Sequence, residues 1–296
     1  MRTLLLLAVG VLAVSMSGPM MAAMTVPPLA LAFWRNGLAA AALAPGALTG
    51  RRAELAGLSW RQLTLVVGAG FALAFHFACW VTALTLTSVA SATAIVCLQI
   101  AWVAAWQLLR GERFNRGVLL GLLLAFSGVL VVSGVDFTLS TRALVGDLLA
   151  LAGGVGAAAY TVIGSRARQS VTTTTYTFVC YGVCAVVLLV ASLVSGQSLA
   201  GYEPAQWGLL VAVTVTAQLM GHSVFNHLLA TTGPMLVSLA LLLEVPGAAL
   251  LAAWFLGQKP PGGALLGLVI ILSGMALVVV GNRHSKLEPI LEPPVD

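Results

Sequence analysis

The side chains of this sequence that could do chemistry are few, and they lie inside apolar stretches. Glu244 stands in LALLLEVPGAALL, residues 239–251, two residues before Pro246. A carboxylate at the centre of a bilayer is disfavoured by about 2.5–3.5 kcal/mol on insertion scales, so one that is kept there usually serves a substrate or proton pathway. A carboxylate in a low-dielectric environment also suits reversible protonation. Glu244 is therefore a candidate for substrate contact and for proton coupling.

A second set of polar side chains recurs every four residues: Thr214, Gln218, His222 and Asn226. This spacing predicts one polar stripe along a helix face. Such a stripe either lines an aqueous cavity or forms hydrogen bonds to neighbouring helices. Four members on one face favour the cavity, so we predict that Gln218, His222 and Asn226 contact substrate.

Aromatic and polar side chains combine in two earlier stretches. Trp80 follows His76 by four residues, and Gln99 is followed by Trp102 at i+3 and Trp106 at i+7. Aromatic walls suit flat organic molecules and cations. We therefore add His76, Trp80, Gln99 and Trp102 to the candidate substrate site, whereas Trp106 is also suited to anchoring at the lipid headgroups.

Three further observations concern protons, charge and thiols. Histidine titrates near neutrality, so His76 and His222 join Glu244 as candidate proton carriers. Arg35, in FWRNGLAAAAL, either extends to the membrane interface or pairs with a substrate carboxylate. The four cysteines lie within apolar stretches, and their expected role is that of small buried apolar residues rather than of metal ligands: Cys79, Cys97, Cys180 and Cys184.

The composition predicts the elements that must position these residues. The chain has 296 residues, of which 60% are hydrophobic and 8% charged, whereas about a quarter of the residues in a globular domain are charged. About 20 apolar residues form a helix that crosses the bilayer. The sequence predicts ten such helices, near 3–24, 28–48, 62–84, 88–109, 117–134, 144–165, 174–195, 206–230, 234–256 and 263–281.

The net charge of +5 is explained by membrane orientation rather than by nucleic-acid binding. With a cytoplasmic N-terminus, only Arg142 and Lys259 of the assigned basic residues face outward, and these face inward: Arg2, Arg51, Arg52, Arg61, Arg110, Arg113, Arg116, Arg166, Arg168, Arg283 and Lys286. This bias predicts that both termini are cytoplasmic in the inner (plasma) membrane. The first stretch also resembles a signal peptide, but its apolar character continues to Met24, which favours a retained helix.

An internal repeat divides the chain. A shift of 146 residues aligns residues 111–132 with 257–278 without a gap, and nine of the 22 pairs are identical, including Gly121/Gly267 and Gly128/Gly274. The same shift aligns His76 with His222. We predict two five-helix repeats, residues 1–135 and 143–282, followed by a cytoplasmic tail, 283–296. Because each repeat has an odd number of helices, the repeats are inverted, as in carriers with a site at the repeat interface.

The chain resembles the drug/metabolite transporter superfamily, specifically its EamA-like members. FWRNGLAAAAL, LLRGERFNRGVLLGLLLAFSGVLVV and LLEVPGAALLAAWFLGQKPPGGALLGLVIILSGMALVV carry the resemblance, which covers all ten predicted helices. It implies an all-helical carrier with a cavity between helices three, four, eight and nine, and relatives that export amino acids or move drugs and nucleotide sugars. The chain departs from the pattern at Gly257-Gln258, where Gly-Glu is usual, and Pro246 has no counterpart near Leu98.

The leading hypothesis is therefore a secondary-active exporter of amino acids or related small metabolites that works by alternating access, without a cofactor or metal. A multidrug, organic-cation or nucleoside-type transporter is the alternative within the superfamily. An intramembrane lipid-modifying enzyme using His76 and His222 is the alternative from another class, and a receptor or scaffold without a cavity is a third. The expected partners are a small-molecule substrate and the lipid bilayer, and a homodimer is left open.

Overall fold

The computed structural model describes residues 2–111, 114–259 and 262–285, in which helices and turns form the chain and no strand occurs. Most of the predicted tail therefore lies outside the described residues. In the first half, the helices are α1 (Arg2–Ser15), α2 (Ser17–Ala22), α3 (Pro28–Pro45), α4 (Arg52–Ala56), α5 (Trp60–Ala83), α6 (Val89–Val96), α7 (Gln99–Leu109) and α8 (Arg116–Leu139), with a short π-helix, η1 (Gly46–Gly50).

The second half has fewer but longer elements. They are α9 (Thr141–Ala167), α10 (Thr173–Val194), α11 (Pro204–Val213), η2 (Thr214–His222, a π-helix), α12 (Ser223–Leu241), α13 (Glu244–Phe255) and α14 (Gly262–Ser285). Residues of each of the ten predicted apolar stretches are helical. Local signals fix several ends: Ser59 and Gln62 form a capping box at the start of α5, and Pro28 and Pro204 begin α3 and α11.

The protein is a multi-pass membrane protein. Within the described residues, six segments are long and apolar enough to cross a bilayer: Thr3–Ala22, Trp60–Ala83, Val89–Leu109, Thr141–Ala167, Thr173–Val194 and Pro204–Ser238. Three shorter apolar helices accompany them: Arg116–Gly128, Glu244–Phe255 and Leu265–Val278. Large apolar side chains such as Leu123, Val194 and Leu250 are exposed on the outside of the helix bundle, as contact with lipid requires.

Two helical segments are interrupted near the positions of the candidate site. The regular α-helical hydrogen bonding is interrupted by tighter turns at Cys97 and Leu98, between α6 and α7, and again at Leu242 and Leu243, between α12 and α13. We call these two interruptions the helix breaks. These breaks are close to 146 residues apart, as the repeat requires. A further kink lies at Gly233, whose φ of 75° is available to glycine, immediately before Pro234.

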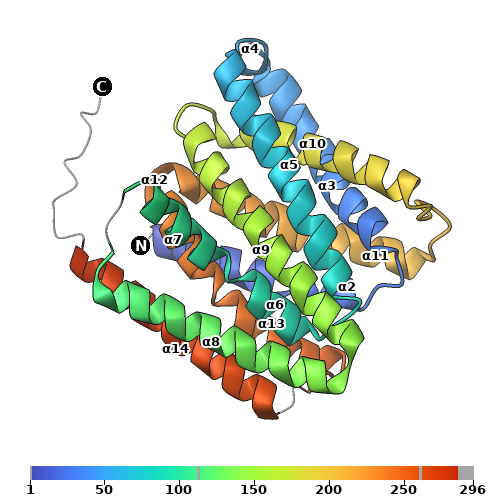
Figure 1. The fold of residues 1–296 in the computed structure, drawn as a ribbon. Coiled ribbons are helices and arrows are strands. Elements are labelled where there is room, and N and C mark those ends of the chain that lie inside the picture. The colour runs from blue at the N-terminus through green and yellow to red at the C-terminus, as the bar shows by residue number, and fades with distance from the viewer. Residues whose placement is uncertain (1, 112–113, 260–261, 286–296) are drawn as a thin grey trace.

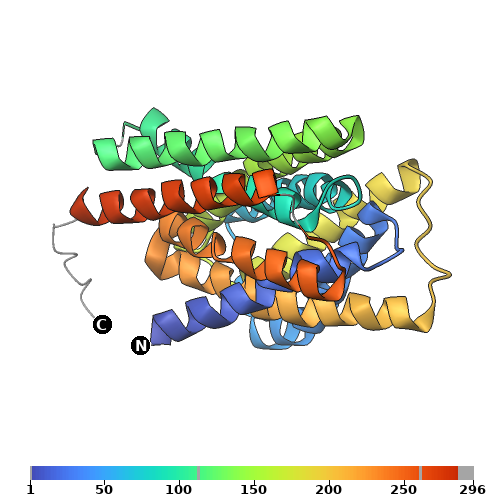
Figure 2. The ribbon, with the colours of Figure 1, turned by 90° about the horizontal axis from the view of Figure 1, so that it is seen from below.

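Helices α8 and α14 lie side by side along one flank of the bundle (Figures 1 and 2). A methyl group on Gly121 would lie 2.5 Å from the carbonyl oxygen of Gly274, and one on Gly128 would lie 2.7 Å from that of Gly267. The repeat aligns Gly121 with Gly267 and Gly128 with Gly274. The two contacts are therefore reciprocal, and small residues let the two backbones touch.

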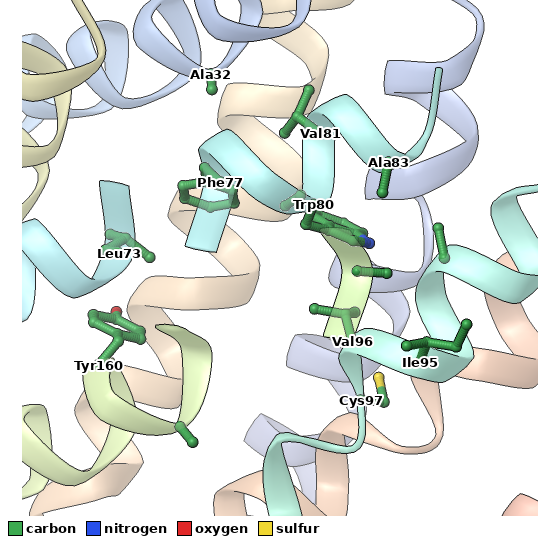
Figure 3. Close-up of a cluster of buried hydrophobic side chains, with 14 of the residues drawn as sticks. Ala32, Leu73, Phe77, Trp80, Val81, Ala83, Ile95, Val96, Cys97 and Tyr160 are labelled. Carbon is green, nitrogen blue, oxygen red and sulfur yellow. The ribbon is translucent and has the colours of Figure 1, made fainter. Parts of the chain in front are cut away.

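The centre of the bundle is packed with large side chains. Trp80 of α5 lies near the end of α6, where Val96 and Cys97 are, whereas Phe77 of α5 and Tyr160 of α9 lie on the other side of Figure 3. All four cysteines are buried and unpaired, as predicted for small apolar residues. This packing surrounds the polar side chains described next.

Candidate functional site

A small cavity of about 40 Å³ lies where the two helix breaks face each other. Six of the predicted site residues line it: His76, Trp80, Gln99, His222, Asn226 and Glu244. A volume of this size holds about one water molecule, whereas binding sites for small organic ligands are typically several hundred Å³. The cavity is thus contracted in this conformation.

Glu244 and Gln99 occupy corresponding places beside the cavity. Glu244 is the first residue of α13 and Gln99 the first residue of α7, directly after the two breaks. Glu244 is buried, with 7% of its surface exposed, and forms no hydrogen bond or ion pair with a described residue. Pro246 lies in the first turn of α13, where its missing N–H leaves no intrahelical bond unmade. Carboxylates are favoured at helix N-termini by the helix dipole.

His76 is held by its neighbours in one orientation. Its Nδ1 lies 3.0 Å from the carbonyl oxygen of Gly153, and its ring stacks on Trp80 at a centroid distance of 5.7 Å. A carbonyl oxygen only accepts hydrogen bonds, so Nδ1 carries the hydrogen and Nε2 is the atom that can exchange a proton. Trp80 is also fixed in the core, and its buried Nε1 has no hydrogen-bond partner in the described structure.

His222 and Asn226 belong to the opposite wall of the cavity. The His222 ring contacts Phe77 and Tyr160, at centroid distances of 5.5 and 6.3 Å. Asn226 accepts a hydrogen bond from the Tyr160 hydroxyl at 2.6 Å and donates one to Tyr181 at 3.2 Å. The amide of Asn226 is therefore engaged in structure, whereas the His222 ring has mainly aromatic neighbours.

Arg35 lies in the core rather than at the membrane interface, because none of its surface is exposed. The predicted extension to the headgroups is therefore wrong. Its Nε donates to Gln218 Oε1 at 2.6 Å, its Nη1 donates to Ser17 Oγ at 2.8 Å, and its guanidinium lies 4.4 Å from the centre of the Phe77 ring. The buried Nη2 has no partner among the described residues. The positive charge of Arg35 also interacts electrostatically with the carboxylate of Glu244.

The predicted stripe on the eighth segment is divided by the π-helix η2. In a π-helix the backbone hydrogen bonds connect residues five apart, so side chains four residues apart no longer lie on one face. His222 and Asn226 line the cavity, but Gln218 binds Arg35 and Asn36, and the Thr214 hydroxyl donates to the carbonyl of Leu210. The prediction that this whole face lines the cavity is thus corrected.

Trp102 lies outside the cavity as well. It lies on a lateral groove between α7 and α9 and contacts Phe126 of α8 at a centroid distance of 6.2 Å. The spacing from Gln99 to Trp102 is that of one helix face, but α7 begins at Gln99 after the break, so α7 presents only its first residue to the cavity.

Comparisons with known proteins assign this chain to a family. The EamA-like transporter family matches residues 1–134 and 144–280, which is nearly the whole chain. The chain belongs to the EamA-like transporter family. It is 26% identical over 260 residues to an uncharacterized transporter of Archaeoglobus fulgidus, and the match covers 87% of this chain and 84% of that one. The protein is thus a membrane transporter.

A solved crystal structure of another protein has the same fold. It superposes with a TM-score of 0.70, covers 96% of this chain and 99% of that chain, and is 19% identical in sequence. At this identity the likeness extends to the fold. The helix order of this EamA-like transporter is therefore one that occurs in an experimentally determined structure.

Several polar residues of this EamA-like transporter's cavity were not among the predicted site residues. Tyr160 and Thr161 of α9 and Ser17 of α2 line the cavity. Tyr160 follows GGVGAAA, and the small residues Gly153 and Gly156 allow α9 to approach α5 beside His76. The combination of a polar aromatic residue with a run of small ones is the signal that could have identified Tyr160.

The chemistry available in the cavity is binding and proton exchange. It combines one carboxylate, two imidazoles and two amides with aromatic walls, and the Arg35 guanidinium donates a hydrogen bond to Ser17, which lines the cavity. No group of three His, Cys, Asp or Glu side chains suited to a metal ion occurs in the described part of the chain. Opposite charges beside an apolar pocket suit a small molecule that carries both charges.

Proposed function

We propose that this EamA-like transporter is a secondary-active exporter of amino acids or related small metabolites in the inner (plasma) membrane. In this proposal, ten transmembrane helices form two inverted repeats, residues 1–135 and 143–282, and both termini are cytoplasmic. The observation that carries the proposal is the position of Glu244, a buried carboxylate that lines the cavity at a break between two helices.

The paired contacts between the halves support the inverted repeat. Gly121 meets Gly274 as Gly128 meets Gly267, which is the reciprocity expected of two copies related by a twofold axis. The breaks before Gln99 and Glu244 lie within one residue of corresponding positions in the repeat. Broken helices near the midplane place half-helix ends beside the substrate in several transporter folds.

The distribution of arginines supports the orientation. Arg61, Arg110 and Arg166 come from α5, from the end of α7 and from α9, yet they line one pocket at the same end of the bundle. Arg142 belongs to the other end, where it donates a hydrogen bond to the carbonyl of Thr85. Excess Lys and Arg marks the cytoplasmic side.

Arg35 and Glu244 together support an amino acid as substrate. Glu244 would bind the ammonium group, and Arg35, whose Nη2 is unpartnered within the described structure, would attract the carboxylate. The stacked His76 and Trp80 rings would also suit an organic cation, which is the second candidate. A cation gains nothing from Arg35, and this difference favours the amino acid.

Alternating access requires the cavity to expand, because about 40 Å³ cannot hold an amino acid. Rocking of one repeat against the other would open it to one side at a time. Protonation of Glu244 would remove its charge while the site is closed, and His76 Nε2 and His222 would exchange the proton with the cavity.

The test compares wild type with Glu244→Gln in proteoliposomes. The wild type should transport radiolabelled amino acids faster when a proton gradient is imposed, and the variant should lose this acceleration. Glutamine keeps the shape of the side chain but does not titrate, so the comparison measures how far transport depends on protonation of Glu244.

Glu203→Gln is the matched control, since Glu203 is an exposed carboxylate at the start of α11. Transport by Glu244→Gln that keeps the full response to the gradient would remove Glu244 from the coupling mechanism. Transport of tetraphenylphosphonium without transport of any amino acid would replace the proposed substrate class by organic cations.

A further inference from the structure

A lateral groove on the outside of the bundle runs along α7 and α9, away from the central cavity. It has a volume of about 470 Å³ and is apolar, with Trp102, Trp106 and Leu109 on one side and Val155 and Val162 on the other. Trp106, Leu109 and Val155 are exposed. The groove therefore presents apolar side chains to whatever surrounds the helices at this depth.

The length of the groove matches one leaflet of a membrane. Its α9 wall extends from Val155 to Arg166, which at 1.5 Å per residue is about 16 Å. The hydrocarbon core of a bilayer is about 30 Å thick, so one leaflet contributes about half of this. A single acyl chain that lies in the groove would contact protein side chains along its whole length.

The groove ends at a basic pocket, which we define by Arg61, Gln62, Arg110, Arg166, Gln169 and Ser170. This pocket has a volume of about 730 Å³, and its described lining contains three arginines and no acidic residue. Arg166 lines both the groove and the basic pocket. The apolar groove and the cationic pocket are therefore continuous.

Two of the three arginines lie beside one indole ring. The guanidinium carbons of Arg110 and Arg166 lie 6.0 and 5.5 Å from the centre of the Trp106 ring, within range of a cation–π contact. Like charges so placed repel each other, and an anion between them would relieve the repulsion. Phosphate oxygens are well suited to arginine because the guanidinium group donates two parallel hydrogen bonds.

We propose that the lateral groove and the basic pocket form a binding site for an anionic phospholipid, with the phosphate of the headgroup between Arg110 and Arg166 and an acyl chain along Trp102, Trp106 and Val155. Basic pockets between transmembrane helices bind anionic headgroups in other membrane proteins. This site is separate from the central cavity, and it binds lipid whether or not the proposed substrate is correct.

The test uses nanodiscs and tryptophan fluorescence. The protein is placed in phosphatidylcholine with a fixed minor fraction of phosphatidylglycerol, and the acyl chains of one lipid or the other are brominated so that they quench tryptophans in contact. Brominated phosphatidylglycerol should quench more than brominated phosphatidylcholine at the same fraction. This excess should be reduced in Trp106→Phe, in which Trp102 still reports contact with the acyl chain, and it should be lost in Arg110→Gln/Arg166→Gln.

The control is Arg51→Gln/Arg52→Gln, which removes the same charge from exposed residues that do not line the basic pocket. It should retain the excess. An excess that is absent in wild type, or that the control loses equally, would overturn the proposal in favour of diffuse surface charge. Glycerol 3-phosphate added to the nanodiscs should leave the excess in place, and complete displacement would show a site for free phosphate instead of lipid.

Discussion

Arg35 is the centre of a network of buried polar contacts. It binds Gln218 and Ser17 and lies over Phe77, and Gln218 in turn donates to Asn36 at 3.0 Å. These contacts connect α3 to α2, to α5 and to η2. A positive charge in this position is tolerated because hydrogen-bond acceptors and an aromatic ring surround the guanidinium group.

Substitution of Arg35 should therefore destabilise the fold. Arg35→Gln removes two hydrogen bonds of a buried charged donor, to Gln218 and Ser17, which we expect to cost roughly 3–5 kcal/mol. We expect a lower thermal unfolding midpoint in detergent, measured by tryptophan fluorescence. The unfolding midpoint of Arg35→Lys should lie between those of wild type and Arg35→Gln, since lysine keeps the charge but cannot form the same pair of hydrogen bonds as the guanidinium group.

Arg52→Gln provides the comparison, because Arg52 is exposed. Its unfolding midpoint should equal that of wild type. Adding Glu244→Gln should change the midpoint by different amounts in the Arg35→Gln protein and in wild type, because the electrostatic interaction between Arg35 and Glu244 is present only in wild type. Equal effects in both backgrounds would show that Arg35 and Glu244 are energetically independent.

At the scale of elements, the contact between α8 and α14 sets how closely the two halves approach. Gly121→Ala places a methyl group 2.5 Å from the carbonyl oxygen of Gly274. The helices must separate to admit it, which we expect to destabilise the protein by about 1–3 kcal/mol. Thermal unfolding in detergent would measure this as a lower midpoint.

Gly182→Ala has the opposite expected sign. Gly182 lies in α10, and nothing lies within 4 Å of the position that its methyl group would take. Alanine is the better helix former by about 1 kcal/mol, so this variant should unfold at a higher temperature than wild type. A Gly121→Ala protein as stable as wild type would contradict the close packing of α8 against α14.

The elements also show which parts of the structure the sequence could predict. Apolar length predicted where helical segments lie, and isolated polar residues predicted that His76, Glu244 and Asn226 would line one cavity. Periodicity assumes a regular α-helix, and so it misplaced Gln218 and Trp102, whose positions depend on η2 and on the break at Leu98. The burial of Arg35 depends on Ser17, Gln218 and Phe77, which are distant in sequence and brought together only by the fold.

At the scale of the whole molecule, one carboxylate joins the two halves at the arginine-rich end. Glu54 of α4 accepts hydrogen bonds from the backbone N–H and the hydroxyl of Thr172, at 2.7 and 2.6 Å, and from the hydroxyl of Thr175 at 2.7 Å. Thr172 is the residue before α10. The loop after α3 is thereby fastened to the start of a helix in the second half.

These hydrogen bonds make the contact sensitive to pH. Partial burial of Glu54 acts to raise its pKa, but the hydrogen bonds from Thr172 and Thr175, together with the charge of Arg51, outweigh burial and lower the pKa below 4.5. A group whose pKa is lower in the folded state stabilises that state above the unfolded pKa, and this stabilisation is lost as the pH falls through the folded pKa. The contact should thus be strong at neutral pH and weaken in acid.

Glu54→Ala should accordingly lower the unfolding midpoint at neutral pH, and the difference from wild type should shrink as the pH falls below 4.5, the ordinary carboxylate value. Glu203→Ala is the matched control, because Glu203 is a carboxylate at the start of a helix, α11, and its side chain makes no capping hydrogen bond. Its effect should be small. A difference between Glu54→Ala and wild type that stays constant across this pH range would show that the stabilisation comes from side-chain packing. A difference that vanishes in acid would locate it in the ionised carboxylate, whose hydrogen bonds then connect the two halves of the transporter.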